Sequence, residues 1–192
     1  PRTVGKIMIG ELTVMDDEMN EMPVGDPGTL WFKPASEFNY HKEPEKTAEA
    51  YSPDKSLTTV GDVGYLDEDG FLYLTDRKAF MIISGGVNIY PQECEDLLIS
   101  HPKVFDAAVF GIPNQDLGEE VKAVVQPVES TISNEELAGE LLEYLHGNLS
   151  RQKVPRSIDF VTELPRLPTG KLYKRVLRDQ YWGEGKSRII QE

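Results

Sequence analysis

Lys171, near the carboxyl end of the chain, has the setting of a catalytic side chain. It follows Thr169 and Gly170, and a glycine lets a backbone turn approach another molecule closely. The lysine ammonium is a compact point charge, which suits it to stabilise negative charge that builds up during a reaction. The same short pattern also fits an ordinary surface lysine in a turn before a helix. By itself, the pattern therefore predicts only a candidate.

A second group of candidates lies upstream, in the segment Thr75–Pro91. Arg77 carries forked donors that can hold ribose or phosphate oxygens, although a structural ion pair with Asp76 or another acid is the plain alternative. An apolar run and then a double-glycine loop follow this arginine. The loop offers donors without side-chain bulk, as a narrow channel requires, and its candidates are Ser84, Gly85 and Gly86.

Asp62 lies in a Gly-Asp-Val-Gly segment that precedes both groups. A carboxylate in such a loop can accept two hydrogen bonds from vicinal ribose hydroxyls. The alternative is an aspartate that only caps its own backbone in a turn. Each of the three motifs is weak alone, but their order along one chain makes the combination far more specific.

Together the three motifs resemble the carboxyl-terminal part of the acyl-CoA synthetases, which are adenylate-forming, AMP-binding enzymes related to coumarate-CoA ligases and luciferases. The resemblance covers nearly the whole chain. It implies that Lys171 is catalytic, that Asp62 and Arg77 bind the nucleotide, and that Ser84, Gly85 and Gly86 line the channel for CoA. Gly86 is the strongest of the three channel residues. Asn88 is left out of the site, because an Asn just before a helix is more often a cap.

The resemblance also implies an activity and its participants. We expect an acid-thiol ligase that converts a carboxylate, ATP and CoA to acyl-CoA, AMP and pyrophosphate through an acyl-adenylate, with Mg²⁺ accompanying ATP. The phosphate-gripping loop and the Thr-Glu motif of the family's large domain are absent from this sequence. We therefore expect the chain to be a fragment, inactive without the missing large domain of the same protein.

Two other functions remain open. One is an adenylation domain that loads a carrier protein; Thr169, where those domains commonly have Asn, and the lack of a following carrier module favour the synthetase. The other is a degenerate, non-catalytic binding module. Its best support is Ala79, because the family usually has Asp or Lys at this position, the hinge about which the small domain turns.

Composition limits the class of protein. A formal charge of -13 argues against nucleic-acid partners, although the segment from Arg151 to Arg188 holds ten Lys or Arg residues against four acidic ones. No apolar run approaches the roughly 20 residues of a membrane span. The single cysteine, Cys94, cannot form an internal disulfide, which fits a cytoplasmic protein. We expect no metal held by protein side chains, because the three histidines are far apart: His41, His101 and His146.

The pattern of apolar residues predicts an α+β fold in two domains. Residues 1–77 form a predicted antiparallel β subdomain, the end of the large AMP-binding domain, with turn residues between short apolar runs. Its expected strands are Lys6–Ile9, Glu11–Val14, Gly28–Phe32 and Phe71–Leu74. Residues 41–50 are expected to form a surface helix or loop.

Residues 78–192 form the predicted second domain, a small, mobile α+β domain that carries Lys171. A helix is expected from Pro91 to about His101, with Cys94, Leu97 and Leu98 on one face. A second helix is expected to begin with a capping box of Ser133 and Glu136. The expected strands are Val104–Phe110, Val121–Val128 and Ser157–Val161, and a closing helix contains Leu172, Val176 and Leu177.

Overall fold

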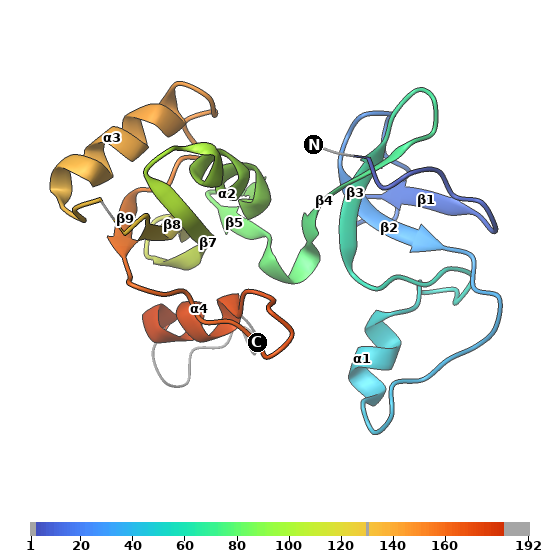
Figure 1. Ribbon diagram of the computed structural model, residues 1–192. Helices are drawn as coiled ribbons and strands as arrows, with labels where there is room; N and C mark the ends of the chain where they lie inside the picture. Colours follow the sequence, from blue (N-terminus) through green and yellow to red (C-terminus); the bar gives the residue numbers. More distant parts are fainter. Residues whose placement is uncertain (1–2, 130, 183–192) are drawn as a thin grey trace. The chain divides into compact units, whose positions relative to one another are not determined.

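The computed structural model describes residues 3–129 and 131–182, and the chain divides into two compact units between Ala79 and Phe80 (Figure 1). Each unit has its own sheet, and every strand pair but one is antiparallel. Helices accompany the sheets, so the predicted α+β class is confirmed. The division falls two residues beyond Arg77, where the sequence analysis placed the end of the first domain.

The first unit is built on a four-stranded antiparallel meander in the order β1-β2-β3-β4. Val14, Leu30 and Val63 are buried and form part of its core. The bounds of its elements are β1 Leu12–Met15, β2 Gly28–Phe32, α1 Pro44–Glu49, β3 Asp62–Leu66 and β4 Leu72–Arg77.

Two predictions for this unit were wrong. Lys6–Ile9 is not a strand, and Met8 and Ile9 are 94% and 92% exposed. Without packing against a core, their apolar character does not lead to the strand that it suggested. The reverse error concerns β3, because Gly61–Gly64 was expected to be a ligand-binding loop, whereas Asp62–Leu66 is a central strand. Gly61 and Gly64, with Asp62 between them, suggested a loop, since these residue types are uncommon in strands.

The second unit contains a five-stranded sheet in the order β6-β5-β8-β7, with β9 pairing in parallel with β8. A long hairpin of β7 and β8 forms its centre, in register from Val104 opposite Pro127 to Asn114 opposite Gly118. The bounds of its strands are β5 Ile82–Ser84, β6 Val87–Ile89, β7 Val104–Asn114, β8 Gly118–Pro127 and β9 Ser157–Phe160. Strand β7 continues beyond its predicted end at Phe110, and β8 begins before its predicted start at Val121 but ends one residue before Val128.

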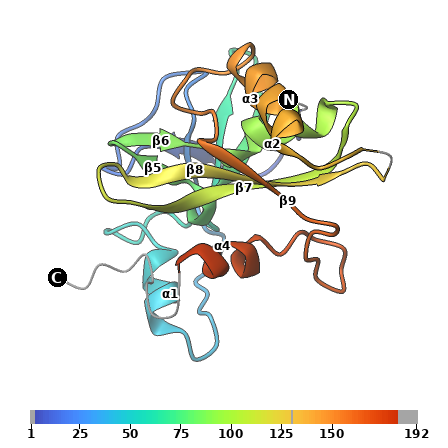
Figure 2. The same ribbon diagram turned by 90° about the vertical axis from the view of Figure 1, so that its left-hand side faces the viewer.

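Helices cover both faces of this sheet. Figure 2 shows α2 (Pro91–Ser100) and α3 (Glu135–His146) on one side of the strands and α4 (Lys174–Trp182) on the other. The core is correspondingly divided, with Val109 and Ala123 packed towards α2 and α3, and Ala108 and Val124 packed towards α4. Strand β8 is consequently buried at every position from Val121 to Val125.

The helix ends follow their local sequence, with one correction. Helix α2 begins at Pro91 and ends at Ser100, as predicted, and Cys94 and Leu98 are buried. The cap of α3 is Asn134, whose side chain accepts a hydrogen bond from the Leu137 backbone, so the predicted capping box of Ser133 with Glu136 was wrong. Ser133 and Asn134 are both good N-cap residues. The helix therefore starts one residue later than predicted, with Leu137, Leu141 and Leu145 in the core.

The closing helix α4 is present, but only part of its predicted apolar face is buried. Leu172 is partly buried but lies before the first residue of α4, so its predicted place in the helix was wrong. Within the helix, Leu177 is buried, whereas Val176 is 38% exposed. No helix among the described residues has both the length and the apolar character needed to cross a membrane.

Candidate functional site

The two nucleotide-binding candidates, Asp62 and Arg77, face each other in the first unit. Arg77 Nε lies 3.2 Å from Asp62 Oδ1, and the exposed fractions of the two side chains are 62% and 28%. The plain alternative for Arg77 was an ion pair with Asp76 or another acid, and Asp62 is this acid. The Arg77 backbone N–H also donates to the Asp76 carboxylate, at 2.7 Å.

Strand register brings the pair together. Asp62 opens β3 and is the Cα partner of Arg77, which closes β4. The register shifts between Val63 and Gly64, where a side chain could not fit because its Cβ would lie 2.4 Å from the Tyr73 carbonyl oxygen. An exposed ion pair contributes little to stability. The Asp62 carboxylate and the Arg77 guanidinium are therefore accessible, and a polar ligand could replace their contact with each other by contacts with itself.

Ala79 lies in a short 3-10 helix, Lys78–Phe80, at the end of the first unit. Its side chain is exposed. Lys78 is anchored within the first unit, because its Nζ atom lies 2.5 Å from Asp17 Oδ1. The predicted hinge residue thus immediately follows an anchored side chain and is the last residue of its unit.

The predicted channel residues form the tight turn of a β-hairpin in the second unit. Ser84 ends β5, Val87 begins β6, and Gly85 and Gly86 connect them with φ angles of +57° and +79°. Both values are in the left-handed region that glycine tolerates at low cost. The sequence analysis recognised the loop but missed the two short strands that hold it. Gly85 also donates its N–H to the Leu117 carbonyl at 2.9 Å, which ties the turn to the β7–β8 connection.

A groove of about 820 Å³ adjoins this turn, and it is lined by Ser84 and Gly85 together with basic side chains. The basic residues are His146 at the end of α3, and Arg151 and Arg156 in the loop before β9. All three are exposed. The sequence analysis noted this basic segment as a whole but did not single out these arginines, which only the fold places beside the glycine turn.

Lys171 lies in an exposed loop between β9 and α4, within a turn that its own backbone stabilises. Its carbonyl accepts a hydrogen bond from Leu167 N, and Gly170 N donates to Leu167 O, both at 2.8 Å. Gly170 has a φ of +83°, so this position favours glycine. Within the described part of the chain, no hydrogen bond or ion pair engages the Lys171 ammonium. The charge is therefore available to a ligand.

The candidates consequently fall into groups. Asp62 and Arg77 are in contact in the first unit, whereas the glycine turn and Lys171 belong to two separate loops of the second unit. Asn88, which the sequence analysis left out of the site, lies in β6 and does not cap α2, whose N-cap is Tyr90.

Cys94 is packed in the core and is not a nucleophile. Its residue is 2% exposed, and burial, with the nearby Glu95 and Glu93 charges, raises the pKa of the thiol to about 12. In residues 3–129 and 131–182, no group of three or more His, Cys, Asp or Glu side chains is arranged to hold a metal ion.

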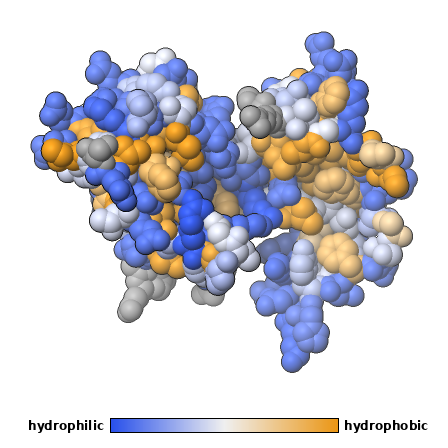
Figure 3. Space-filling view, in the orientation of Figure 1, coloured by the Kyte–Doolittle hydropathy of each residue, from blue (hydrophilic) through white to orange (hydrophobic). Residues whose placement is uncertain are grey.

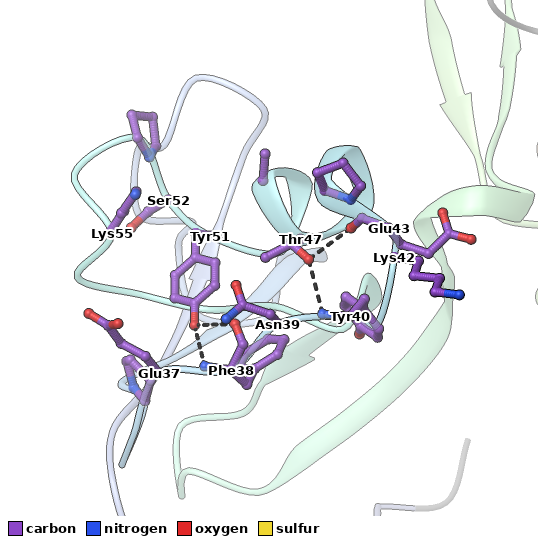
Figure 4. A pocket seen from close by; sticks show the side chains of 14 residues that line it. Glu37, Phe38, Asn39, Tyr40, Lys42, Glu43, Thr47, Tyr51, Ser52 and Lys55 are labelled. Carbon is purple, nitrogen blue, oxygen red and sulfur yellow. Dashed lines mark hydrogen bonds between the residues drawn. The ribbon is translucent and has the colours of Figure 1, made fainter.

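Another cavity, of about 830 Å³, lies in the first unit beside α1 and contains none of the predicted site residues. Figure 4 shows its aromatic wall, in which Tyr51 accepts a hydrogen bond from Phe38 N and donates one to Phe38 O. Thr47 accepts from Tyr40 N and donates to Glu43 O in the same way. These side chains hold the loop before α1 in place, so we interpret them as structural.

The chain is similar to known proteins over most of its length. Residues 93–171 match the family model described as the AMP-binding enzyme C-terminal domain. A long-chain-fatty-acid–CoA ligase of Yersinia pestis is 39% identical over 171 residues, which are 88% of this chain and 29% of that protein. A fatty acid–[acyl-carrier-protein] ligase, ScoC of Streptomyces coeruleorubidus, is 36% identical over 92% of this chain and 33% of its own length.

The crystal structure of ATP-bound MatB from Rhodopseudomonas palustris superimposes with a TM-score of 0.80 and is 34% identical, over 94% of this chain and 36% of that one. The chain thus spans about a third of the length of the proteins it matches. Residues 93–171 form an AMP-binding enzyme C-terminal domain, and the chain as a whole is similar to the carboxyl-terminal portion of the adenylate-forming acyl-CoA ligases.

Proposed function

We propose that this chain forms the carboxyl-terminal portion of an ATP-dependent acyl-CoA synthetase and supplies its catalytic lysine. The observation that carries this proposal is the exposed ammonium of Lys171, held on a defined turn in a chain related to CoA ligases. In the first half-reaction, a carboxylate oxygen attacks the α-phosphorus of ATP and pyrophosphate leaves. In the second, the CoA thiolate attacks the acyl carbon and AMP leaves.

Lys171 would act in the first half-reaction. The carboxylate and the phosphate are both negative, and charge builds up between them as the new bond forms. A positioned ammonium lowers this barrier most when it contacts both groups in the transition state. Because no side chain neutralises Lys171 within the described residues, its full charge is available for this task.

Asp62 and Arg77 would bind the nucleotide. The Asp62 carboxylate would accept hydrogen bonds from the two ribose hydroxyls, and Arg77 would donate to ribose or phosphate oxygens. Their contact of 3.2 Å uses one guanidinium nitrogen, Nε, and so leaves the forked end of Arg77 for the ligand.

The hairpin turn and its groove would bind CoA. Ser84, Gly85 and Gly86 would line the path of the pantetheine arm, because a turn without large side chains lets a slender chain pass. The adjoining groove brings Arg151 and Arg156 to the same region, and their guanidinium groups suit the phosphates of CoA.

Residues 1–79 would complete the large domain. Figure 3 shows hydrophobic surface over the sheet of the first unit. The exposed apolar side chains of this unit include Val4, Ile7, Met8, Ile9, Val24 and Val60. Apolar surface of this extent is typical of an interface. We infer that the rest of the large domain, with its phosphate-binding loop, covers it.

Ala79 would be the hinge between the two half-reactions. The division of the chain falls directly after it, and a residue with a small side chain can change its backbone torsions without a steric penalty from neighbours. Magnesium would enter as the companion of the ATP phosphates and neutralise part of their charge.

The test of this function uses the complete gene. We expect the sequence upstream of Pro1 to encode a Ser/Thr/Gly-rich phosphate loop, and the expressed enzyme to catalyse ATP–pyrophosphate exchange with a carboxylic acid. Fatty acids are the first substrates to test, since the relatives of Yersinia and Streptomyces are named for them. Supplying CoA or a holo-carrier protein as the acceptor then separates the synthetase from a carrier-loading enzyme.

The 192-residue chain alone provides the second test. We expect no exchange above background, because Lys171 lacks the phosphate loop that completes the ATP site. Turnover comparable to that of the enzyme from the complete gene would contradict the division of the active site between the two portions. A complete gene without the phosphate loop would instead favour a non-catalytic binding module.

A further inference from the structure

We propose that Arg166 is a positioning residue that fixes the turn carrying Lys171 to the central sheet of the second unit. This inference rests on the proposed catalytic role of Lys171. Arg166 precedes Lys171 by five residues, and its guanidinium makes two contacts that connect otherwise separate parts of the fold.

The first contact is with the turn. Arg166 Nη1 donates to the carbonyl oxygen of Gly170 at 2.6 Å. This carbonyl belongs to the peptide group that ends at the nitrogen of Lys171, so a shift of the carbonyl moves the lysine backbone with it. The contact is charge-assisted and therefore stronger than an ordinary hydrogen bond between neutral groups.

The second contact is with the sheet. Arg166 Nη2 bonds to Oδ2 of Asp106, an aspartate of β7 whose side chain is only 9% exposed. The other carboxylate oxygen of Asp106 accepts a hydrogen bond from Ala107 N at 2.9 Å, which holds the carboxylate in one orientation. Asp106 is thus a rigid anchor in the longest hairpin of the unit, and Arg166 connects it to the turn.

The remaining bonds do not fix the turn itself to the sheet: the bond from Leu164 N to Gln126 Oε1 of β8, at 3.1 Å, lies seven residues before Lys171. Leu167 N to Lys171 O, Gly170 N to Leu167 O and Tyr173 N to Pro165 O all join residues within the loop itself. They define the shape of the turn but not its position relative to β7. Because a misplacement of about 1 Å can reduce a reaction rate about 10²-fold, the position of the turn matters for catalysis even when its shape is kept.

The experiment compares four variants in the enzyme expressed from the complete gene: Arg166→Gln, Arg166→Lys, Lys171→Ala and the double variant Arg166→Gln with Lys171→Ala. Arg175→Ala is the matched control, since Arg175 is an exposed cation of the same segment whose partner, Asp179, lies one helical turn away. Each half-reaction is measured separately, with kcat and KM for the carboxylate and for ATP. In parallel, the amide shifts of Gly170 and Lys171 and their hydrogen exchange are measured by NMR in the 192-residue chain.

We expect Arg166→Gln to lower kcat of adenylation at least tenfold with little change in KM, to leave thioester formation from supplied acyl-adenylate within about twofold, and to accelerate exchange at Gly170 and Lys171. Arg166→Lys should restore part of the rate, because one ammonium can reach one partner but lacks the fork for both. The double variant should be no slower than Lys171→Ala, since a positioning residue has no effect once the positioned group is gone. Arg175→Ala should behave as the unmodified enzyme.

Two outcomes overturn the proposal, and a third leaves its decision to the exchange measurement. If both half-reactions of Arg166→Gln fall in parallel with its loss of folded protein, Arg166 has only a structural role. If Arg166→Gln keeps the original rate of adenylation while Lys171→Ala loses it, Arg166 does not position the lysine. If Lys171→Ala itself retains adenylation, the proposed function of Lys171 fails, and the exchange measurement alone then reports whether Arg166 holds the turn.

Discussion

Lys174 Nζ lies 2.7 Å from Glu95 Oε1, and this ion pair joins α4 to α2 inside the second unit. The two side chains are only 9% and 5% exposed. Glu95 Oε1 also accepts the backbone N–H of Val109 in β7, at 2.6 Å, and the Lys174 ammonium lies 5.1 Å from the centre of the Phe80 ring. Three residues after Lys171, the chain is thus fixed to a helix and a strand at once.

Removing one member of this pair should destabilise the second unit strongly. We expect Lys174→Met to lower the free energy of unfolding by about 3 kcal/mol, because Glu95 would keep a buried charge without its counterion. Adding Glu95→Gln should recover part of the loss, since the amide oxygen can still accept from Val109. Urea unfolding of the 192-residue chain measures both, and a Lys174→Met variant within 0.5 kcal/mol of the original, on the order of a surface substitution, would contradict this account.

Lys171→Ala should separate the two half-reactions in the enzyme from the complete gene. We expect adenylation to fall about 10²-fold or more, since the ammonium acts where phosphate charge develops, while thioester formation from supplied acyl-adenylate stays largely intact. Thermal melting serves as the control, because an exposed lysine should not affect folding. An equal fall in both half-reactions would assign Lys171 a different role.

Substitutions at Ala79 test what the hinge requires. If the domain turns through backbone torsions alone, Ala79→Asp and Ala79→Lys should leave both half-reactions nearly unchanged, whereas Ala79→Pro should impair thioester formation because it fixes φ and removes a donor. We expect this torsional result. Single-turnover measurement of each half-reaction decides it, and normal thioester formation in the proline variant would eliminate Ala79 as the hinge.

Asp159 should make the second unit sensitive to acid. Burial raises the pKa of its carboxyl, but hydrogen bonds from Lys122 and Tyr181 and the Lys122 charge outweigh this effect and bring the pKa below its ordinary value of 3.8. The stabilisation is therefore complete above pH 3.8 and is lost as the pH falls through the lower, folded-state value. Asp159→Asn should be less stable than the original at neutral pH, and the difference between their melting temperatures should shrink in acid. A difference that is constant with pH would contradict the assignment.

Tyr181 should give the corresponding effect in alkali. Burial, and next its hydrogen bond to Asp159, raise the pKa of the phenol above its ordinary value of 10.0. The stabilisation by the neutral phenol is complete below pH 10.0 and is lost as the pH rises through the folded-state value. We expect the melting temperatures of the original and of Tyr181→Phe to converge at high pH. When tyrosine ionisation is followed by absorbance, the Tyr181→Phe chain should have one fewer tyrosine that ionises only at high pH than the original chain has.

Cys94 should react with thiol reagents only when the second unit opens. Its thiol is buried and its pKa is raised to about 12. Near neutral pH, a reagent therefore rarely reaches the thiol, and the thiol is rarely ionised. We expect labelling at pH 8 to be about 10²-fold slower in buffer than in urea. A labelling rate in buffer that equals the rate in urea would mean that Cys94 on α2 is accessible in the folded protein.

Several parts of this protein could be predicted because their signals are local. Proline at the start of α2 and the leucines of α3 at helical spacing specify their helices with little help from the rest of the chain. The Gly85–Gly86 turn is equally local, since its left-handed torsions are available mainly to glycine. Even among these, the start of α3 was one residue off, because Ser133 and Asn134 are adjacent and both are good N-caps.

Other parts were misread because a residue's burial depends on what packs against it. The apolar run Lys6–Ile9 looks like a strand yet is exposed, and the segment Gly61–Gly64 looks like a loop although Asp62–Leu66 forms a central strand. Strand pairing supplies the missing information, since it is a contact between segments far apart in the sequence.

The sequence by itself determined the residue types available for chemistry, their order along the chain and the family that they resemble. Only the tertiary structure decided how they are supported: Asp62 opposite Arg77, the arginines beside the glycine turn, and Arg166 between Asp106 and Gly170. The physical reason is that a motif is a local arrangement of backbone and side chains, whereas each of these contacts depends on strand register and on which face of a sheet a loop or helix covers.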